Sequence, residues 1–571
     1  MSESPTASPE KPRAKTAARI GWAILIFTTL YVCYFSHLGA IGFVGPDEPR
    51  YAWIARDMAE TGDWVTPRLY GQPWFEKPPL YYWEAAVSFK VFGVSETAAR
   101  LPSAFSALLA TLALAWLAWR MYGEETARWL LLLLPTSLGM IGFSHAAATD
   151  MPFSGMLTIS MVCAAVVLRL VPAAAGGESP APTNSSTPWA ALILFGFFLG
   201  LAVLAKGPAG IILCGGAVFF WTLFTKRWRD AFRLLHPAAI AAFCLTALPW
   251  YILCARRNPD FFRVFIIEHN FKRYLTPEFQ HIQPFWFYCA VLVVALLPWT
   301  ALAAWAASTG SAQLWRSKRI SPSSLYLLMW VLFCLIFFSI SKSKLPGYIL
   351  PAIPALVALM TRSRFAFASA RTRALSVFLL VSSLLFACCF AVVEYLTPHI
   401  SQANLNFGIS AGLIFGALSV ANLFLGAGTS FGAKGALGQG FAACCVLPIL
   451  FAMSNANKLL PSFFYHDPSG RTLSEELRRR AIPVAELTVV KPMNRGQLYS
   501  LSFYLHREIA ECDREHPEEG YVLTERIYRR SELGSGFTAK EVHFDLDTTG
   551  FFLYRIEKRS PAGRASSGQL E

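Results

Sequence analysis

Long apolar runs separated by short polar segments dominate this chain. About 13 of these runs approach or reach the roughly 20 residues that a helix needs to cross a bilayer. They are Ala23–Leu38, Leu101–Trp119, Trp129–Phe143, Phe153–Leu170, Ala190–Leu204, Ala209–Phe224, Ala238–Cys254, Phe285–Trp305, Leu325–Ile340, Tyr348–Met360, Leu375–Val393, Ile409–Leu425 and Ala436–Met453. The pattern predicts a polytopic α-helical membrane protein with about 13 transmembrane helices.

The segment Gly45–Trp83 interrupts this apolar pattern directly after the first run. It carries acidic and basic side chains in close succession: Asp47, Glu48, Arg50, Arg56, Asp57, Glu60, Asp63, Arg68, Glu76 and Lys77. Charges beside an apolar span are costly unless they lie at the membrane–water boundary and handle something charged. Within Pro49–Glu60, the less polar positions 51, 54, 55 and 58 predict an amphipathic helix along the interface. We therefore expect a site at the membrane surface that acts on a phosphorylated substrate.

Composition agrees with a membrane protein, and the charge pattern predicts its orientation. Of the 571 residues, 54% are hydrophobic and only 15% are charged. The formal net charge of +14 does not indicate a nucleic-acid partner, because Lys and Arg recur in alternate connecting segments, as they do in cytoplasmic loops. This bias predicts a cytoplasmic N-terminus. It places segments 45–83, 255–284 and 341–347 outside, together with the C-terminal region.

Three regions are predicted along the chain. Residues 1–19 are polar and rich in Pro and Ser, and we expect a disordered cytoplasmic tail. Residues 20–456 would form the transmembrane domain with its external interfacial loops. Residues 457–571 have a mixed polar pattern that predicts a small extracytoplasmic α/β domain without a recognisable catalytic motif. Its expected elements are a helix at Glu475–Arg480 and strands at Glu486–Lys491, Gly520–Leu523 and Phe551–Ile556.

Three external carboxylates are candidates for chemistry, and each also has a structural interpretation. Asp47 stands just before the predicted interfacial helix, and Asp150 stands at the start of a span, so either could be a helix cap. Glu76 and Lys77 lie between aromatic residues and prolines in QPWFEKPPL, where proline stiffens the backbone. An ion pair that holds the loop together is the alternative for these two.

Several external cations run against the orientation pattern. Lys206 ends the fifth span, and Lys342 and Lys344 precede Tyr348 in SKSKLPGY. A lysine that reaches from the span toward water is the alternative for Lys206, whereas contact with phosphate would explain the lysines at 342 and 344.

Other external residues offer possible metal ligands. In the loop 255–284, Glu268 or His269 could bind a metal, although a single His does not define a metal site. Taken together, the external loops supply cations that could stabilise a departing phosphate and carboxylates that could orient or deprotonate an acceptor.

Six short motifs occur in an order that resembles one group of enzymes. They are PDEPRYA, WFEKPPLYYW, TDMP, LAKGP, EHN and KLPGYILP. This set resembles the polyprenyl-phosphate-sugar-dependent glycosyltransferases with the GT-C fold. Within that group it is most similar to the bacterial transferases of 4-amino-4-deoxy-L-arabinose to lipid A, which are relatives of the protein O-mannosyltransferases. The resemblance covers roughly Gly45 to Pro354.

The resemblance implies a role for each matching residue. It implies that Asp47 is the leading catalytic carboxylate, with Asp150 on the acceptor or sugar side. It implies that Glu76 and His269 share a divalent metal such as zinc, and it implies no organic cofactor. The residues expected near the carrier phosphate are Arg50, Lys77, Lys206, Arg273, Lys344 and Tyr348.

The implied reaction transfers a sugar from undecaprenyl phosphate with inversion, at the periplasmic face of a bacterial inner membrane. Lipid A is the candidate acceptor, and another glycan or a protein is an alternative. A transporter or flippase of lipid-linked sugars would bind the same phosphates, but transporters usually carry polar residues at the bilayer midplane in repeated halves. The charges of this chain gather at the external ends of its spans, and no internal repeat is evident. A receptor or assembly scaffold would leave the charged loops unexplained.

Overall fold

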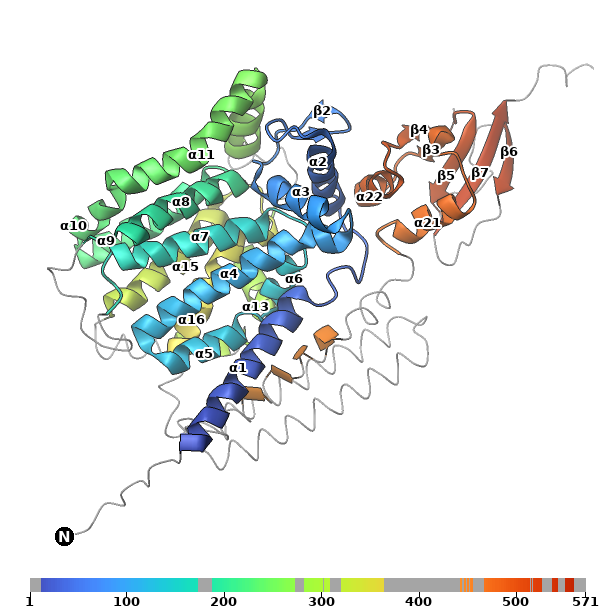
Figure 1. Ribbon diagram of the computed structural model, residues 1–571. Coiled ribbons are helices and arrows are strands. Elements are labelled where there is room, and N and C mark those ends of the chain that lie inside the picture. Colours follow the sequence, from blue (N-terminus) through green and yellow to red (C-terminus); the bar gives the residue numbers. More distant parts are fainter. Residues whose placement is uncertain are drawn as a thin grey trace, which may run out of the picture.

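The structure is a computed structural model of the 571-residue chain. It describes residues 12–172, 187–272, 282–300, 320–363, 467–513, 517–525, 537–542 and 550–558, together with residue 515 and separate positions within 302–308 and 442–454. Figure 1 shows a large helical bundle beside a smaller unit that contains a β-sheet.

Six helices among the described residues are long and apolar enough to cross a membrane. They are α1 (Pro12–Phe35), α4 (Glu96–Tyr122), α7 (Asp150–Val167), α8 (Trp189–Lys206), α11 (Pro237–Arg257) and α15 (Pro322–Ile340). The pair α5 (Glu124–Leu133) and α6 (Leu138–Ser144) makes a seventh span if the two helices, bent by 62°, are counted as one. The chain is therefore a multi-pass helical protein.

The prediction of about 13 spans is matched only in part by the described residues. Leu375–Val393 and Ile409–Leu425 lie outside them, and Ala436–Met453 is described only at separate positions. Three further apolar runs form shorter helices, which are α9 (Ala209–Thr225), α13 (Phe287–Ala295) and α16 (Ile353–Ser363). The total number of spans and the cytoplasmic N-terminus stay predictions.

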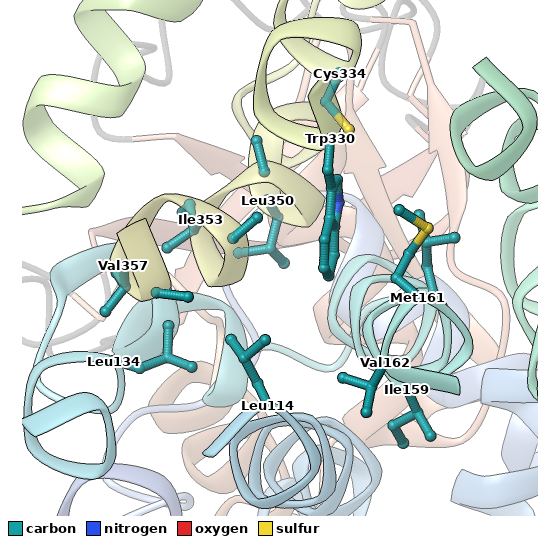
Figure 2. Close-up of a cluster of buried hydrophobic side chains, with 14 of the residues drawn as sticks. Leu114, Leu134, Ile159, Met161, Val162, Trp330, Cys334, Leu350, Ile353 and Val357 are labelled. Atoms are coloured by element: carbon teal, nitrogen blue, oxygen red, sulfur yellow. The ribbon is translucent and has the colours of Figure 1, made fainter. Parts of the chain in front are cut away.

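Most residues of α7 are buried inside the bundle, whereas most residues of the apolar stretches of α1 and α11 are not. Figure 2 shows side chains of α4, α7, α15 and α16 meeting in one core, among them Leu114, Met161, Trp330 and Ile353. Small residues allow the backbones of two helices to approach closely, and they are common at helix contacts in membranes. A Cβ atom added to Gly196 of α8 would lie 2.0 Å from the carbonyl oxygen of Ala239 in α11.

Between the first two long helices, the charged segment forms two short helices that do not cross the bundle. They are α2 (Asp47–Thr61) and α3 (Leu80–Phe92), separated by the small hairpin β1 (Arg68–Leu69) and β2 (Gln72–Pro73). The amphipathic helix predicted at Pro49–Glu60 is confirmed as α2, whose residues at 51, 54, 55 and 58 are buried. With 13 residues, α3 is too short to span a bilayer.

The C-terminal unit is an α/β structure with a mixed five-stranded sheet. The sheet order is β4-β3-β5-β7-β6, in which β3 is parallel to β4 and β5, and β7 is antiparallel to β5 and β6. Its elements are α21 (Arg471–Arg479), β3 (Leu487–Val490), α22 (Arg495–Leu505), β4 (Ala510–Cys512), β5 (Gly520–Glu525), β6 (Phe537–Val542) and β7 (Phe551–Lys558). The predicted domain boundaries and extracytoplasmic position stay predictions.

One buried carboxyl group on α3 predicts a dependence of stability on pH. Oε2 of Glu84 is buried without a hydrogen-bond partner, and burial raises the pKa of Glu84 to about 8 from an ordinary value of 4.5. Between these two values the folded protein keeps the proton and the unfolded chain releases it, so folding stability falls as pH rises. The Glu84→Gln variant should therefore gain little in melting temperature at pH 4.5 and progressively more up to pH 8. Equal gains at both values, measured by thermal unfolding in detergent, would contradict this.

Candidate active site

A buried ion pair fixes the chain segment that leads into α2. Arg100, near the start of α4, donates to both carboxylate oxygens of Glu48, at 2.9 and 2.8 Å. It also donates to the carbonyl oxygens of Leu38, Ile41 and Gly42, at 2.7 to 2.9 Å. A buried charge is tolerated only when it is paired and its remaining donors are satisfied, and Arg100 meets both conditions.

Glu48 extends this contact to a second loop. Its carboxylate accepts hydrogen bonds from the backbone N–H of Val44, at 2.9 Å, and from that of Ala147, at 2.7 Å. Ala147 lies just before α7, which begins at Asp150. The carboxylate of Glu48 therefore connects the chain segment before Asp47 to the segment before Asp150.

The first turn of α2 gathers three of the predicted site residues. Nη2 of Arg50 lies 2.5 Å from Oδ1 of Asp47 and 3.0 Å from Oε2 of Glu76. Burial alone would lower the pKa of Arg50, but the charges of Glu76 and Asp47 outweigh it and raise that pKa. The side chain of Asp47 is 49% exposed, whereas that of Glu76 is 9% exposed, so Asp47 is the more accessible of the two carboxylates.

The interpretation of Asp47 as a cap is wrong, as is its expected position just before the helix. Asp47 is the first residue of α2, and the preceding residue is Pro46. Its carboxylate turns to Arg50, one turn along the helix, because a guanidinium is a stronger partner than a backbone N–H. Asp150 likewise opens α7, after Thr149, and its partner is a lysine.

Glu76 and Lys77 lie in the stiff loop between β2 and α3. Nζ of Lys77 is 3.8 Å from Oε1 of Glu76, so the expected ion pair exists beside the contact with Arg50. Glu76 and His269 line one cavity of about 490 Å³. His269 lies on a π-helical segment, η2 (Arg263–Lys272), a conformation that is frequent at functional sites.

A second group of predicted residues forms where α7, α8 and η3 (Pro346–Ala352) meet. Nζ of Lys206 lies 2.5 Å from Oδ1 of Asp150 and 4.6 Å from the ring centre of Tyr348. A Cβ atom on Gly347 would lie 2.5 Å from the same Asp150 oxygen, so this close approach requires glycine. The side chain of Lys206 is only 10% exposed. The alternative interpretation, in which Lys206 merely reaches from the span toward water, is therefore wrong.

Lys344 stands apart from both groups. Nζ of Lys344 donates to the carbonyl oxygens of Ser341, at 2.6 Å, and Gln283, at 3.0 Å, so its ammonium group joins two loops. Burial lowers the pKa of Lys344, and the neighbouring charge of Lys342 adds to the effect. Arg273 lies outside the described residues.

Glu76 and His269 are the residues expected to bind a metal. A carboxylate and an imidazole are ligand types that zinc prefers, and Glu76 and His269 share a cavity. In the described part of the chain, however, no cluster of three or more His, Cys, Asp or Glu residues could hold a metal. Glu76 and His269 would thus supply two of the three ligands that a catalytic zinc site usually takes from protein.

Sequence reasoning missed the role of Glu48 and Arg100. Glu48 was visible only as one more charge beside Asp47, and Arg100 as a residue at the edge of an apolar run. A charged residue within the first turns of a span was the available signal, because such a charge requires a partner.

The family model of dolichyl-phosphate-mannose-protein mannosyltransferases matches residues 20–265. Relatives named undecaprenyl phosphate-α-4-amino-4-deoxy-L-arabinose arabinosyl transferase include that of Enterobacter sp. (strain 638), 33% identical over 56% of this chain and 54% of its own length. The one from Erwinia tasmaniensis is 30% identical over 71% of this chain and 72% of its own length. The alignment with the Enterobacter protein thus spans about half of that relative.

A solved structure shows the same fold over almost the whole chain. The crystal structure of ArnT from Cupriavidus metallidurans bound to undecaprenyl phosphate matches with a TM-score of 0.72 and 23% sequence identity. The match covers 94% of this chain and 98% of that one. At this identity, the likeness establishes the shared fold.

The buried pair at the entrance to α2 predicts a large loss of stability when one partner is removed. Arg100→Met leaves Glu48 buried without its cation, and we expect a cost of about 3–5 kcal/mol, seen as a lower melting temperature in detergent. The control Arg479→Met removes an exposed arginine from Glu476, which keeps its ion pair with Arg480, and should change the melting temperature little. A double variant, Arg100→Met with Glu48→Leu, should be less destabilised than Arg100→Met alone. A double variant less stable than Arg100→Met would show that the unpaired charge of Glu48 is not the cause of the lost stability.

Proposed function

The chain belongs to the family of undecaprenyl phosphate-α-4-amino-4-deoxy-L-arabinose arabinosyl transferases, and from this membership we propose that it is a membrane glycosyltransferase that uses a polyprenyl-phosphate-linked sugar. The observation that carries the proposal is the group formed by Asp47, Arg50 and Glu76. It pairs a solvent-accessible carboxylate with a largely buried guanidinium at one end of an apolar bundle. A lipid-linked phosphate would present its charge at this boundary.

The proposed reaction is a displacement at the anomeric carbon. An acceptor oxygen forms the new bond as the bond to the phosphate oxygen breaks, and the carrier phosphate leaves with the electron pair. Arg50 and Lys77 would stabilise the negative charge of the leaving phosphate. Attack from the opposite face inverts the anomeric centre.

Asp47 would act on the acceptor. A carboxylate can orient a hydroxyl and accept its proton, but an acceptor phosphate is already ionised near neutral pH. For such an acceptor, Asp47 would hold the reacting oxygen in place, and positioning alone contributes much of the rate. Asp150, held by Lys206 beside Tyr348, would face the sugar or the acceptor.

The donor we propose is undecaprenyl phosphate carrying 4-amino-4-deoxy-L-arabinose, and the acceptor is a lipid A-type molecule of the cell envelope. The support for the donor is the name shared by the relatives and the carrier lipid in the similar crystal structure. The acceptor rests on the resemblance of the sequence motifs. Transfer to another glycan or to a protein is the alternative outcome for the acceptor. We further propose a bacterial inner-membrane location, with a cytoplasmic N-terminus and the site on the periplasmic face.

Replacing the candidate catalytic carboxylate tests the reaction. In purified full-length protein, Asp47→Asn should lower transfer by at least about a hundredfold, because the amide neither carries charge nor accepts a proton. Product formation is measured as the mass increase of lipid A after incubation with the polyprenyl-phosphate-linked sugar.

A matched control is Glu124→Gln on α5, where an exposed carboxylate pairs with Arg128. This variant should retain activity, since an exposed pair contributes little. Full activity of Asp47→Asn, with normal membrane insertion, would refute the assignment of Asp47.

The metal is a separate proposal, in which zinc is held by Glu76 and His269 and neutralises charge beside the site. We expect purified protein to retain zinc in elemental analysis after dialysis and His269→Ala to lose most of it. His506→Ala, a substitution at an exposed histidine of the C-terminal unit, should leave the zinc content unchanged. Equal zinc content in wild type and His269→Ala would exclude His269 as a ligand.

A further inference from the structure

Helix α22 of the C-terminal unit packs directly against α2. Figure 1 shows α22 as the part of this unit that lies closest to α2. Two side-chain contacts join the helices near their C-terminal ends. Arg56 donates to the carbonyl oxygen of Phe503, and Nε2 of His506, the residue after α22, lies 3.1 Å from Oε2 of Glu60. The C-terminal unit thus touches the helix that begins with Asp47.

Helix α22 also holds the backbone just before Asp47. The N–H of Phe43 donates to the hydroxyl of Tyr504 at 3.1 Å, and the hydroxyl of Ser500 donates to the carbonyl oxygen of Phe43 at 3.3 Å. A Cβ atom on Gly496 would lie 2.9 Å from the carbonyl carbon of Gly45, so the two backbones are in contact. This segment is therefore held from one side by α22 and from the other by Arg100.

The same helix places an aromatic ring against the guanidinium group of Arg50. The ring centres of Tyr51 and Trp74 lie 5.4 Å from Cζ of Arg50, and that of Tyr499, on α22, lies 5.8 Å away. Tyr499 is itself stacked on Tyr70, with ring centres 6.4 Å apart. One of the three aromatic rings around this guanidinium therefore comes from the C-terminal unit.

We infer that the C-terminal unit is part of the active site, and that Tyr499 is a positioning residue that holds Arg50 for the carrier phosphate. The inference rests on the proposed function, in which Arg50 contacts that phosphate. It assigns a role to a region whose sequence carries no catalytic motif.

The physical reason lies in the kind of partner that an aromatic ring provides. Asp47 and Glu76 attract Arg50 but also neutralise it, which weakens its hold on a phosphate. A ring face attracts the guanidinium through its quadrupole and carries no net charge, so it fixes the side chain without cancelling its cation. Arg50 can then exchange a carboxylate for the incoming phosphate without losing its position.

The test uses the purified full chain and separates donor binding from turnover. Tyr499→Leu should raise the KM for the polyprenyl-phosphate-linked sugar by about three- to thirtyfold, which is the range that a loss of one cation–π contact produces, with a smaller change in kcat. It should weaken binding of undecaprenyl phosphate alone by a similar factor. Tyr499→Phe keeps the ring and should restore both values to within about twofold of wild type.

The chain offers a matched control in the same unit. Arg555 lies over the ring of Tyr521, with Cζ 5.9 Å from the ring centre, on the β-sheet rather than on α22. Tyr521→Leu removes an arginine–aromatic contact of the same kind and should leave the donor KM unchanged. A similar increase of the donor KM in both leucine variants would mean that the C-terminal unit has merely become less stable. This result would overturn the positioning role of Tyr499.

A double-mutant cycle with Arg50→Lys makes the inference specific. If Tyr499 acts through the guanidinium of Arg50, Tyr499→Leu should weaken carrier binding less in the Arg50→Lys background than in wild type. Full additivity would overturn the inference. Wild-type protein that does not bind undecaprenyl phosphate would instead overturn the proposed function, so the two failures can be told apart.

Discussion

The buried ion pair between Glu48 and Arg100 is the contact on which the geometry of the candidate site depends. Two charges removed from water are stable only if they pair and satisfy their remaining donors and acceptors. Here the remaining groups are the backbone of the segment before α2 and the N–H of Ala147 before α7. The requirement to satisfy one buried pair therefore orders the two loops that carry Asp47 and Asp150.

The same rule governs the site residues themselves. Arg50 lies between two carboxylates and three aromatic rings, and Lys206 lies between Asp150 and the ring of Tyr348. At the edge of an apolar bundle, a cation without such partners would be costly. In the proposed function a phosphate replaces one of these partners, so the arrangement that stabilises the two cations also prepares them for an anionic ligand.

The structure brings predicted residues together where short motifs carry the information. The apolar spacing at positions 51, 54, 55 and 58 predicted α2, and the family motifs named Asp47, Arg50 and Glu76, whose side chains the structure places in contact. The sequence did not reveal that Asp47 pairs with Arg50 instead of capping the helix, nor that Lys344 binds two carbonyl groups. Such choices depend on which partner comes within reach, and reach is a property of the folded chain.

The sequence by itself determined the class of the protein, because the length and apolarity of its runs indicate helices in a bilayer and its charges gather at their ends. It also determined the chemistry available there, since carboxylates, lysines and arginines recur in family motifs. Only the tertiary structure decided that Glu48 and Arg100 hold the site and that α22 completes the surroundings of Arg50. Arg50 and Tyr499 are separated by most of the chain, and contacts across such distances arise from packing, which no local pattern encodes.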